Sequence, residues 1–282
     1  MPEGDTLLRI AVVLRPVLAG RRITDARGRP GGAHLERVIG ANVESVEARG
    51  KHLLIGFSNG LTLHTHLGLH GSWHRYRRGE PWRRAASRAF AVLETAESVA
   101  VCFDAPTVEL MDARAVDAHP ALRRLGPDVA ADDFDVEAAL RLLRSRGDAP
   151  IGDALLDQAA VAGLGNVYRS ELCFLERINP FSPVSEVGDE ALRRMLARGV
   201  RLVRANSAGG ARVTTPAGTP GNTYVYGRAG RPCRFCGTLI RSAVSTRSPG
   251  ATPRRVYWCP SCQPSSSPGI VVPLDTTMVT GT

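Results

Sequence analysis

The hydrophobic and polar positions follow two different periods along this 282-residue chain. From Gly4 to Leu18 the apolar residues recur every three or four positions, which predicts an amphipathic helix. Between about residues 23 and 116 the apolar runs are short, and turn residues separate them in pairs, as in β-hairpins. The two clearest pairs are Leu53–Phe57 with Leu61–Thr65 and Phe90–Glu94 with Val99–Phe103. This half therefore predicts a β-sandwich or barrel that carries one N-terminal helix.

The second half of the chain has a helical period. Apolar residues recur every three or four positions in four segments beyond His119-Pro120, namely Val136–Leu143, Ile151–Ala162, Val167–Arg177 and Glu190–Ala205. A loop rich in glycine, threonine and proline follows at residues 207–222, and the chain ends in a stretch typical of a flexible tail. We therefore expect domains at residues 1–118, 119–222 and 223–263, with a tail at 264–282.

Basic residues outnumber acidic residues by 36 to 27, and the resulting net charge of +9 favours a polyanionic partner. A coding bias toward arginine would raise the charge in the same way and weakens this signal. Of the 36 basic residues 35 are arginine, and Lys51 is the one lysine. Arginine keeps its proton in a protein whereas lysine can lose it, so Lys51 is a candidate for proton chemistry, with chance survival as the alternative.

The chain shows no sign of export or membrane insertion. No apolar run approaches the roughly 18 residues that a membrane-spanning helix requires. Glu3 and Asp5 stand where a secretory signal would have a basic segment followed by an apolar core. We therefore expect a cytoplasmic bacterial protein with no membrane partner.

Four of the six cysteines form two closely spaced pairs, Cys233-x2-Cys236 and Cys259-x2-Cys262, which 22 residues separate. Each pair presents two thiolates to one tetrahedral ion, so this spacing predicts a single structural Zn²⁺. Disulfides are disfavoured in the expected cytoplasm. The segment between the pairs predicts a small hairpin that would not fold without metal. Its arginines favour contact with phosphates, although a zinc ribbon that is only a structural cap has the same spacing.

A glycine-rich motif, Ala162-Gly163-Leu164-Gly165-Asn166, joins two of the predicted helices. Its glycines permit left-handed backbone, so the chain can turn sharply there. Asn166 stands where a helix N-cap belongs, and the start of a helix suits a phosphate. An ordinary helix–turn–helix hairpin needs the same glycines.

The N-terminus offers a second kind of chemistry. Met1 precedes the small residue Pro2, a context in which the initiator methionine is removed. Pro2 would then be a secondary amine with a pKa near the α-amino reference of about 7.7–8.0, so part of it is free base at pH 7. Such an amine can attack the anomeric carbon of a sugar, and Glu3 beside it can move protons.

Taken in order, four motifs resemble the Fpg/Nei family of bifunctional DNA glycosylases over nearly the whole chain up to Gln263. They are Pro2-Glu3-Gly4-Asp5-Thr6, Gly50-Lys51-His52-Leu53-Leu54, the stretch from Leu156 to Glu171, and Val225-Tyr226-Gly227-Arg228 leading into the first cysteine pair. The opening resembles the Nei (endonuclease VIII) branch, in its actinobacterial-like form. The resemblance implies a multidomain α+β fold. Its parts are a β-sandwich with an N-terminal helix, a helical helix–two-turn–helix domain and a small zinc-finger hairpin.

The resemblance also implies catalytic roles. Pro2 would form the Schiff base with the sugar C1′, and Glu3 would be the general acid/base that opens the ribose ring. Lys51 would donate a proton during β-elimination. Arg254 would bind phosphate and assist δ-elimination, although Arg255 stands next to it and could take that place.

Four further residues are expected to contact DNA. The resemblance implies that Arg124 and Asn166 hold the phosphates beside the flipped nucleotide, and that Leu69 and His70 fill the space that the base leaves. Gly68 stands where relatives of the Nei branch often carry a larger polar wedge. A weaker wedge raises the cost of flipping a base from duplex DNA, so we expect good activity on single-stranded or forked DNA as well as on duplex.

His64 and His66 lie on one face of a predicted strand, as a pair of metal ligands would. No third ligand stands at a suitable spacing in the sequence, so we interpret both as structural or DNA-facing.

The predicted function is that of a monomeric, nucleoid-associated DNA glycosylase/AP lyase of base excision repair. It would remove oxidised pyrimidines and nick the strand by β,δ-elimination. One alternative is an Fpg-like preference for oxidised purines, and another is a non-catalytic damaged-DNA-binding protein of the same fold. A zinc-ribbon transcription factor would leave the N-terminal motif unexplained.

Overall fold

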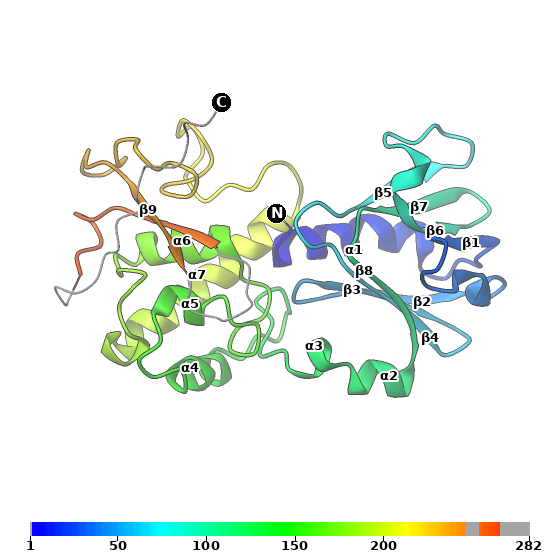
Figure 1. Ribbon diagram of the computed structural model, residues 1–282, viewed down its shortest axis with the longest axis horizontal. Helices are drawn as coiled ribbons and strands as arrows, with labels where there is room; N and C mark the ends of the chain where they lie inside the picture. Colours follow the sequence, from blue (N-terminus) through cyan, green and yellow to red (C-terminus); the bar gives the residue numbers. More distant parts are fainter. Residues whose placement is uncertain (1, 246–253, 266–282) are drawn as a thin grey trace, which may run out of the picture.

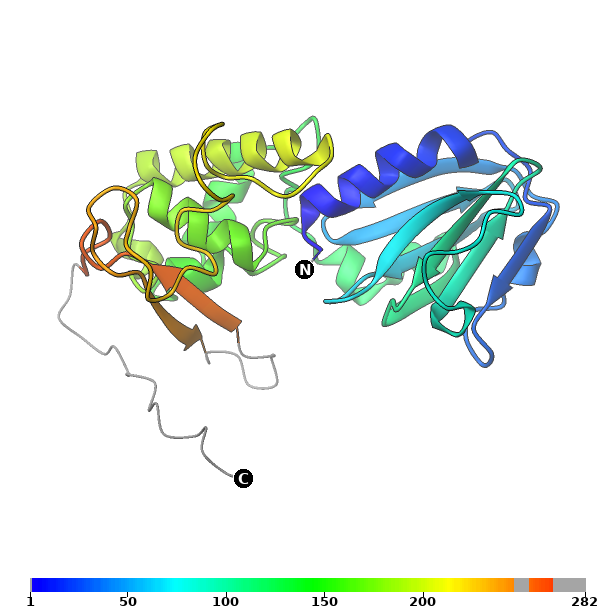
Figure 2. The ribbon, with the colours of Figure 1, turned by 90° about the horizontal axis from the view of Figure 1, so that it is seen from above.

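The computed structural model describes residues 2–245 and 254–265, so the predicted tail lies outside the described residues from position 266 onward. The chain forms an N-terminal and a C-terminal lobe, and its N-terminus lies between them (Figures 1 and 2). The first helix, α1 (Gly4–Leu18), belongs to the N-terminal lobe and has the predicted bounds. Among the described residues, no helix is long and apolar enough to cross a lipid bilayer.

Two antiparallel four-stranded sheets make up the rest of the N-terminal lobe. One has the order β1-β6-β7-β5, with β1 (Asp25–Gly28), β6 (Ala89–Glu94), β7 (Ser98–Phe103) and β5 (Ser72–Arg77). The other has the order β2-β3-β4-β8, with β2 (Val43–Arg49), β3 (His52–Phe57), β4 (Leu61–His66) and β8 (Thr107–Asp112). Both predicted hairpins are confirmed, and the predicted β-sandwich with one N-terminal helix is present.

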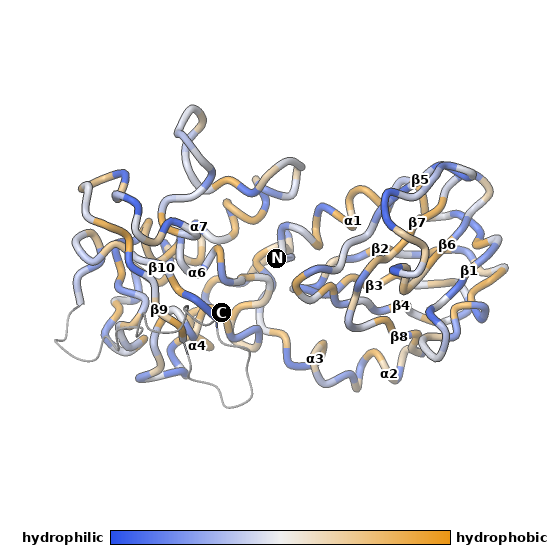
Figure 3. The backbone as a smooth tube through the Cα atoms, turned by 45° about the horizontal axis from the view of Figure 1, so that its top comes forward, coloured by the Kyte–Doolittle hydropathy of each residue, from blue (hydrophilic) through white to orange (hydrophobic). Residues whose placement is uncertain are grey.

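The core of this lobe lies between the sheets and α1. Hydrophobic and hydrophilic positions are interspersed along β2 and β5, because successive side chains of a strand point to opposite faces, whereas β3, β6 and β7 are apolar along most of their length (Figure 3). Leu53, Ile55 and Leu63 from β3 and β4 are fully buried in this core together with Leu7 and Leu14 from α1. The opposite face of the same sheet carries the histidines of β3 and β4.

A short linker leads from β8 into the C-terminal lobe through α2 (Ala113–Ala118) and α3 (Pro120–Arg123). The helical lobe contains α4 (Val136–Arg144), α5 (Ile151–Ala154), α6 (Asn166–Leu175) and α7 (Asp189–Ser207). The hairpin of β9 (Arg241–Ser245) and β10 (Arg254–Trp258) follows. Figure 2 shows α6 between α7 on one side and this hairpin on the other. The central position of α6 explains why nine of its ten residues are buried.

The helix predicted for residues 151–162 is wrong beyond Ala154, because α5 ends there and the chain turns. Local side-chain hydrogen bonds hold these turns and compete with helix formation. Asp157 Oδ1 accepts from the backbone N of Ala159 at 2.9 Å. Gln158 donates to the carbonyl oxygens of Leu156 and Leu164 at 2.9 and 3.0 Å, and its Oε1 accepts from Gly163 N at 3.1 Å. These turns carry the chain from α5 to α6.

Candidate active site

The N-terminal segment is held against the glycine-rich motif that precedes α6. Gly4 N donates to the carbonyl oxygen of Gly163 at 2.8 Å. A Cβ atom on Gly4 would lie only 3.0 Å from the Cα and O atoms of Gly163, so glycine permits this close approach. Pro2, half-buried, therefore stands at the junction of the two lobes.

The carboxylate of Glu3 is fully buried at the N-terminus of α6. It accepts from Val167 N at 2.9 Å and from Tyr168 N at 3.5 Å, two of the amides that a helix leaves unpaired in its first turn. A Cβ atom on Gly165 would lie 2.3 Å from Cδ of Glu3, so any larger residue at position 165 would displace this side chain. The glycine-rich motif thus makes room for a catalytic candidate in addition to turning the chain.

The expectation for Asn166 needs one correction. Gly165, rather than Asn166, is the N-cap of α6, and Asn166 is the first residue of the helix. Its Nδ2 donates to the backbone carbonyl of Arg255 at 3.0 Å, which ties the start of α6 to β10. The backbone amides at the start of α6, which the sequence suggested as phosphate ligands, donate to the carboxylate of Glu3 instead.

Arg212 joins this site from the loop after α7, although the sequence did not single it out. Its Nε and Nη2 donate to the two oxygens of Asp5 at 2.7 and 2.6 Å, and its Nη1 lies 3.8 Å from Oε1 of Glu3. The guanidinium also lies over the ring of Tyr168, 5.2 Å from its centroid. The loop of residues 207–222 is thereby fastened to the N-terminal segment. The only feature of the sequence that could have indicated this contact is the presence of an arginine in a loop rich in glycine and threonine.

Lys51 follows a tight turn at Gly50, which has a φ of +59°. Gly50 N donates to Oδ2 of Asp128 at 2.6 Å, so the turn is attached to the C-terminal lobe. Burial lowers the pKa of Lys51 to about 8, and the nearby carboxylate of Glu3 opposes this effect. Arg254 also lowers the pKa of Lys51, which places both Glu3 and Arg254 within electrostatic reach of the amine.

The neighbours Arg254 and Arg255 differ in their surroundings, because successive side chains of β10 point to opposite faces. The exposed Arg255 donates from Nη1 to Oγ of Ser242 at 3.0 Å. The positive charge of Arg254 lowers the pKa of both Lys51 and His66. Of the two, Arg254 is therefore the arginine on the Lys51 side of the hairpin.

The loop between β4 and β5 presents Leu69 and His70 to solvent, and Leu69 is 54% exposed. Gly68 has a φ of +55°, and a Cβ atom there would lie 2.8 Å from Cγ of Pro106. The backbone conformation and Pro106 thus require glycine at this position, whatever the neighbouring residues contact. Arg124 is exposed after α3, and among the described residues no hydrogen bond or ion pair links it to the site around Glu3.

The four cysteine sulfurs come together beside α6, within 4.8 Å of one another. The Sγ atoms of Cys233 and Cys262 are 3.8 Å apart, and Cys236 lies 3.5 Å from both Cys259 and Cys262. A tetrahedral zinc with Zn–S bonds of about 2.3 Å separates its sulfurs by about 3.8 Å. The cluster therefore has the donor set and the spacing to hold one metal ion.

Glu171 of α6 holds the segment that leads into this cluster. Its buried carboxylate accepts from the backbone N of Tyr224, Val225 and Tyr226 at 2.8, 2.9 and 2.8 Å. Phe174, one turn further along α6, stacks on Tyr224 with ring centroids 5.3 Å apart. The cysteine cluster is thus positioned by the same helix whose N-terminus holds Glu3.

The sequence offers His64 no third ligand at a suitable spacing, whereas the fold brings two further candidate ligands beside it. Glu109 and His119 lie beside it, and the three side chains form a second group with the geometry to hold a metal ion. Burial lowers the pKa of the adjacent His52 to about 3, so this ring is neutral at pH 7. His64, Glu109 and His119 come from two different strands and from the linker, so their spacing in the sequence does not predict that they lie together.

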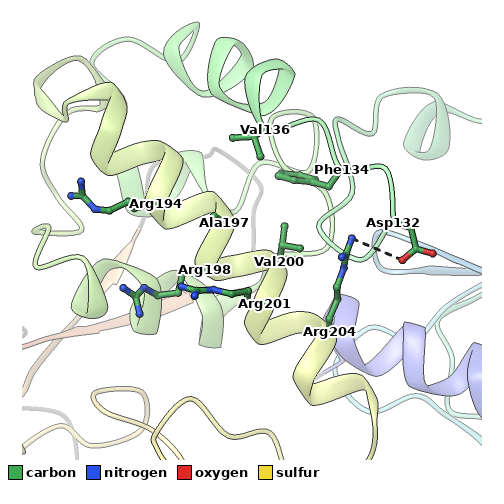
Figure 4. Close-up of a pocket in the computed structure, with 9 residues that line it drawn as sticks. All are labelled: Asp132, Phe134, Val136, Arg194, Ala197, Arg198, Val200, Arg201 and Arg204. Atoms are coloured by element: carbon green, nitrogen blue, oxygen red, sulfur yellow. Dashed lines mark ion pairs between the residues drawn. The ribbon is translucent and has the colours of Figure 1, made fainter.

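A separate pocket lies along the outer face of α7 (Figure 4). Arginines of α7 line it, together with Phe134 and Val136 at the start of α4. Arg194 and Arg198 are already paired with Glu176, and Arg204 donates to the carbonyl of Ala131. None of the lining residues belongs to the site around Glu3.

Comparisons with known proteins agree with this arrangement. Residues 1–116 match the formamidopyrimidine-DNA glycosylase N-terminal domain, and residues 125–215 match the formamidopyrimidine-DNA glycosylase H2TH domain. Among solved structures, complexes of Lactococcus lactis Fpg with DNA are similar to this chain. A complex with DNA containing Fapy-dG has a TM-score of 0.77 at 22% identity and covers 94% of this chain and 100% of the other. A non-covalent complex with DNA containing an AP site has a TM-score of 0.78 at 22% identity, with 93% and 100% covered. At such identities the likeness shows the fold.

Curated relatives are closer in sequence. The chain is 40% identical to probable endonuclease 8 2 of Streptomyces coelicolor over 270 residues, 95% of this chain and 96% of the relative. It is 38% identical to the DNA-(apurinic or apyrimidinic site) lyase Nei2 of Mycolicibacterium smegmatis over 267 residues, 94% of this chain and 100% of the relative. The chain therefore belongs to the Fpg/Nei family of DNA glycosylases, and to its endonuclease 8 branch.

Proposed function

We propose that the protein is a bifunctional DNA glycosylase/AP lyase of base excision repair that removes oxidised pyrimidines through a Schiff base on Pro2. The observation that carries this proposal is the convergence of three distant segments. Glu3 is bound at the start of α6, the turn before Lys51 packs against the glycine-rich motif, and the carbonyl of Arg254 accepts from Arg169 of α6 at 3.2 Å. Relatives named endonuclease 8 and AP lyase share the full length of the fold, which supports both halves of the activity.

The chemistry follows from the positions of these groups. After removal of Met1, the neutral amine of Pro2 attacks C1′ of the damaged nucleotide, the bond from C1′ to the base breaks, and the base leaves with the proton that the amine nitrogen gives up. Glu3 supplies the proton that opens the sugar ring. The resulting iminium makes the C2′ proton acidic, and its loss expels the 3′ phosphate by β-elimination. Lys51 donates a proton in this stage, and Arg254 binds the phosphate that leaves in the following δ-elimination.

Damaged duplex DNA is the proposed partner, bound by a monomer in the bacterial cytoplasm and associated with the nucleoid. Leu69 and His70, both exposed, would enter the duplex where the base leaves, while Arg124 and Asn166 would hold the flanking phosphates. The positive φ of Gly68 and the nearby Pro106 leave no room for a larger side chain at this position. The loop conformation therefore explains why no polar wedge is present there. Single-stranded and forked DNA remain proposed substrates because Leu69 is the only large apolar residue that the loop exposes, Leu67 being buried.

A panel of oligonucleotides tests the substrate class. The lesions are thymine glycol, 5-hydroxyuracil, dihydrouracil, 8-oxoguanine and an abasic site, each in single and double strands. We expect faster excision of the three pyrimidines than of 8-oxoguanine, and faster cutting of single strands than of duplex. Preferred excision of 8-oxoguanine would favour the purine alternative. Failure of borohydride to trap the protein on abasic DNA would favour the non-catalytic one.

One structural Zn²⁺ in the Cys₄ cluster completes the proposed enzyme. We expect Cys236→Ser to lose this ion and to disorder the β9–β10 hairpin, because a hairpin of this size does not fold without its metal. Arg254 would then leave the site, and strand cleavage should fall by on the order of 10-fold to 100-fold. Metal content by atomic emission and cleavage of abasic DNA check this. Ser261→Ala, an exposed change between the last two cysteines, should alter neither.

The lowered pKa of Lys51 predicts a pH dependence. A proton donor acts in its protonated form, so kcat/KM for strand cleavage should fall as pH rises above about 8, the pKa of Lys51 in the free enzyme. Pro2 acts in its neutral form and causes the rise at lower pH. Lys51→Arg keeps the charge but cannot give up its proton, so its strand cleavage should be weaker than that of the wild type and should show no alkaline fall. Persistence of the same fall in this variant would assign it to another group.

A further inference from the structure

Four of the seven histidines gather in one region, where three lie on the sheet face that points away from the core and His119 lies beside them in the linker. His52 pairs with His66 and His64 pairs with Glu109 across neighbouring strands. The ring centroid of His52 lies 5.0 Å from those of His64 and His66, and the centroids of His64 and His119 are 4.8 Å apart. The proposed DNA chemistry assigns no role to His52, His64, Glu109 or His119, which we call the histidine cluster.

Two imidazoles of the histidine cluster converge on one carboxylate oxygen. Oε2 of Glu109 lies 2.9 Å from Nδ1 of His64 and 3.2 Å from Nε2 of His119. One ligand atom from each of the three residues lies within 4.8 Å of the others. A tetrahedral zinc with bonds of about 2.0–2.1 Å separates its ligand atoms by about 3.3 Å. Both distances to the carboxylate oxygen are close to that spacing.

Neighbouring side chains hold the buried ligand of this group in a fixed orientation and leave the other two partly open to solvent. The side chain of His64 is 1% exposed, and its Nε2 lies 2.8 Å from Nδ1 of His52. A histidine that binds a metal through one nitrogen usually has the other held by a hydrogen bond, which fixes its tautomer and orientation. On the opposite side Glu109 is 46% exposed and His119 is 17% exposed. An ion can enter from this side and keep a water molecule as its remaining ligand.

We propose that His64, Glu109 and His119 bind one divalent ion of the zinc class, separate from the Cys₄ cluster. Two neutral imidazole nitrogens and one carboxylate oxygen form a donor set that zinc accepts. With the ion on Nδ1 of His64, the proton of this ring stands on Nε2 and is donated to Nδ1 of His52, whose own proton then stands on its Nε2. Nδ1 of His119 gives up the bond that it accepts from Leu122 N, which at 3.4 Å is long and weak.

The position of His119 suggests what this ion does. His119 lies between α2 and α3, in the linker that joins the lobes, whereas His64 and Glu109 belong to β4 and β8. A shared ion therefore ties the linker to the sheet. The N-terminus lies at the junction of the same two lobes (Figure 1), so the ion would restrain how the lobes move around the catalytic candidates.

The test counts metal ions on the full-length protein. After equilibration with Zn²⁺ and desalting, atomic emission should find two ions per chain in the wild type and one in Glu109→Gln and His119→Ala. His34→Ala is the matched control, because His34 also contacts a glutamate, Glu36, but on the surface and outside the cluster. It should retain two ions. Cys236→Ser should lose one ion independently, which assigns the first ion to the Cys₄ cluster.

Two outcomes would overturn the proposal: one ion in the wild type whose loss follows Cys236→Ser, or two ions in both cluster variants. Both altered side chains are partly exposed, and circular dichroism verifies that the variants fold. Hydrogen exchange then tests the restraint. Added Zn²⁺ should slow the exchange of amides at residues 113–123 in the wild type and leave it unchanged in His119→Ala. Equal exchange with and without Zn²⁺ in the wild type would refute the restraint. Neither result depends on whether Pro2 forms a Schiff base.

Discussion

Blocking the amine of Pro2 is expected to abolish covalent capture of abasic DNA while leaving DNA binding nearly intact. A residue retained or fused ahead of Pro2 converts its secondary amine into an amide, which has no free lone pair for attack at C1′. Loss of a catalytic nucleophile costs on the order of 10³-fold or more in rate. Borohydride trapping and strand cleavage measure the loss, and the Kd for abasic DNA measures binding.

The control for this experiment is the same extension followed by a protease site that regenerates Pro2. Removal of the extension should restore trapping to the wild-type level. The variant Pro2→Gly keeps a free amine but loses the ring, so we expect it to trap DNA more weakly than the wild type and better than the blocked chain. Efficient trapping by the blocked chain would instead make Lys51 the nucleophile, since it is the only lysine.

Glu3→Gln is expected to separate the two halves of the activity. The glutamine retains an oxygen to accept from Val167 N but cannot deliver a proton to the sugar, so base excision should fall by about 10²-fold to 10⁴-fold. An abasic site already opens to an aldehyde, so Pro2 can attack it without this step. Cleavage at a preformed abasic site should therefore change by less than about tenfold.

The ratio of excision to abasic-site cleavage is the decisive measurement for Glu3. Glu36→Gln is the matched control, because its side chain is 61% exposed and far along the chain from the glycine-rich motif. It should leave the ratio unchanged. Equal losses of excision and of abasic-site cleavage in Glu3→Gln would indicate that the carboxylate positions the N-terminus and is not the acid. A purely positioning role for Glu3 has to be excluded, because its carboxylate is buried and bound to the backbone at the start of α6.

The contacts of Glu3 also show why the glycine-rich motif has two functions. Gly163 turns the chain with a φ of +91°, which local sequence patterns predict. Gly165 leaves room for a side chain 162 positions earlier, which no local pattern can show. Arg212 is a similar case, since its partner Asp5 is 207 positions away. Both contacts depend on the path of the whole chain between the lobes.

Periodicity and spacing determined what is local in this protein. The sequence predicted the bounds of α1 and the β3–β4 hairpin, and it drew attention to the two cysteine pairs and to Lys51. Each of these depends on neighbouring residues or on residue type. Only the tertiary structure decided that Glu3 occupies the start of α6, that Arg254 rather than Arg255 lies on the Lys51 side, and that His64 meets Glu109 and His119. The physical reason is that strand pairing and lobe docking bring together side chains whose separation along the chain carries no information about their distance in space.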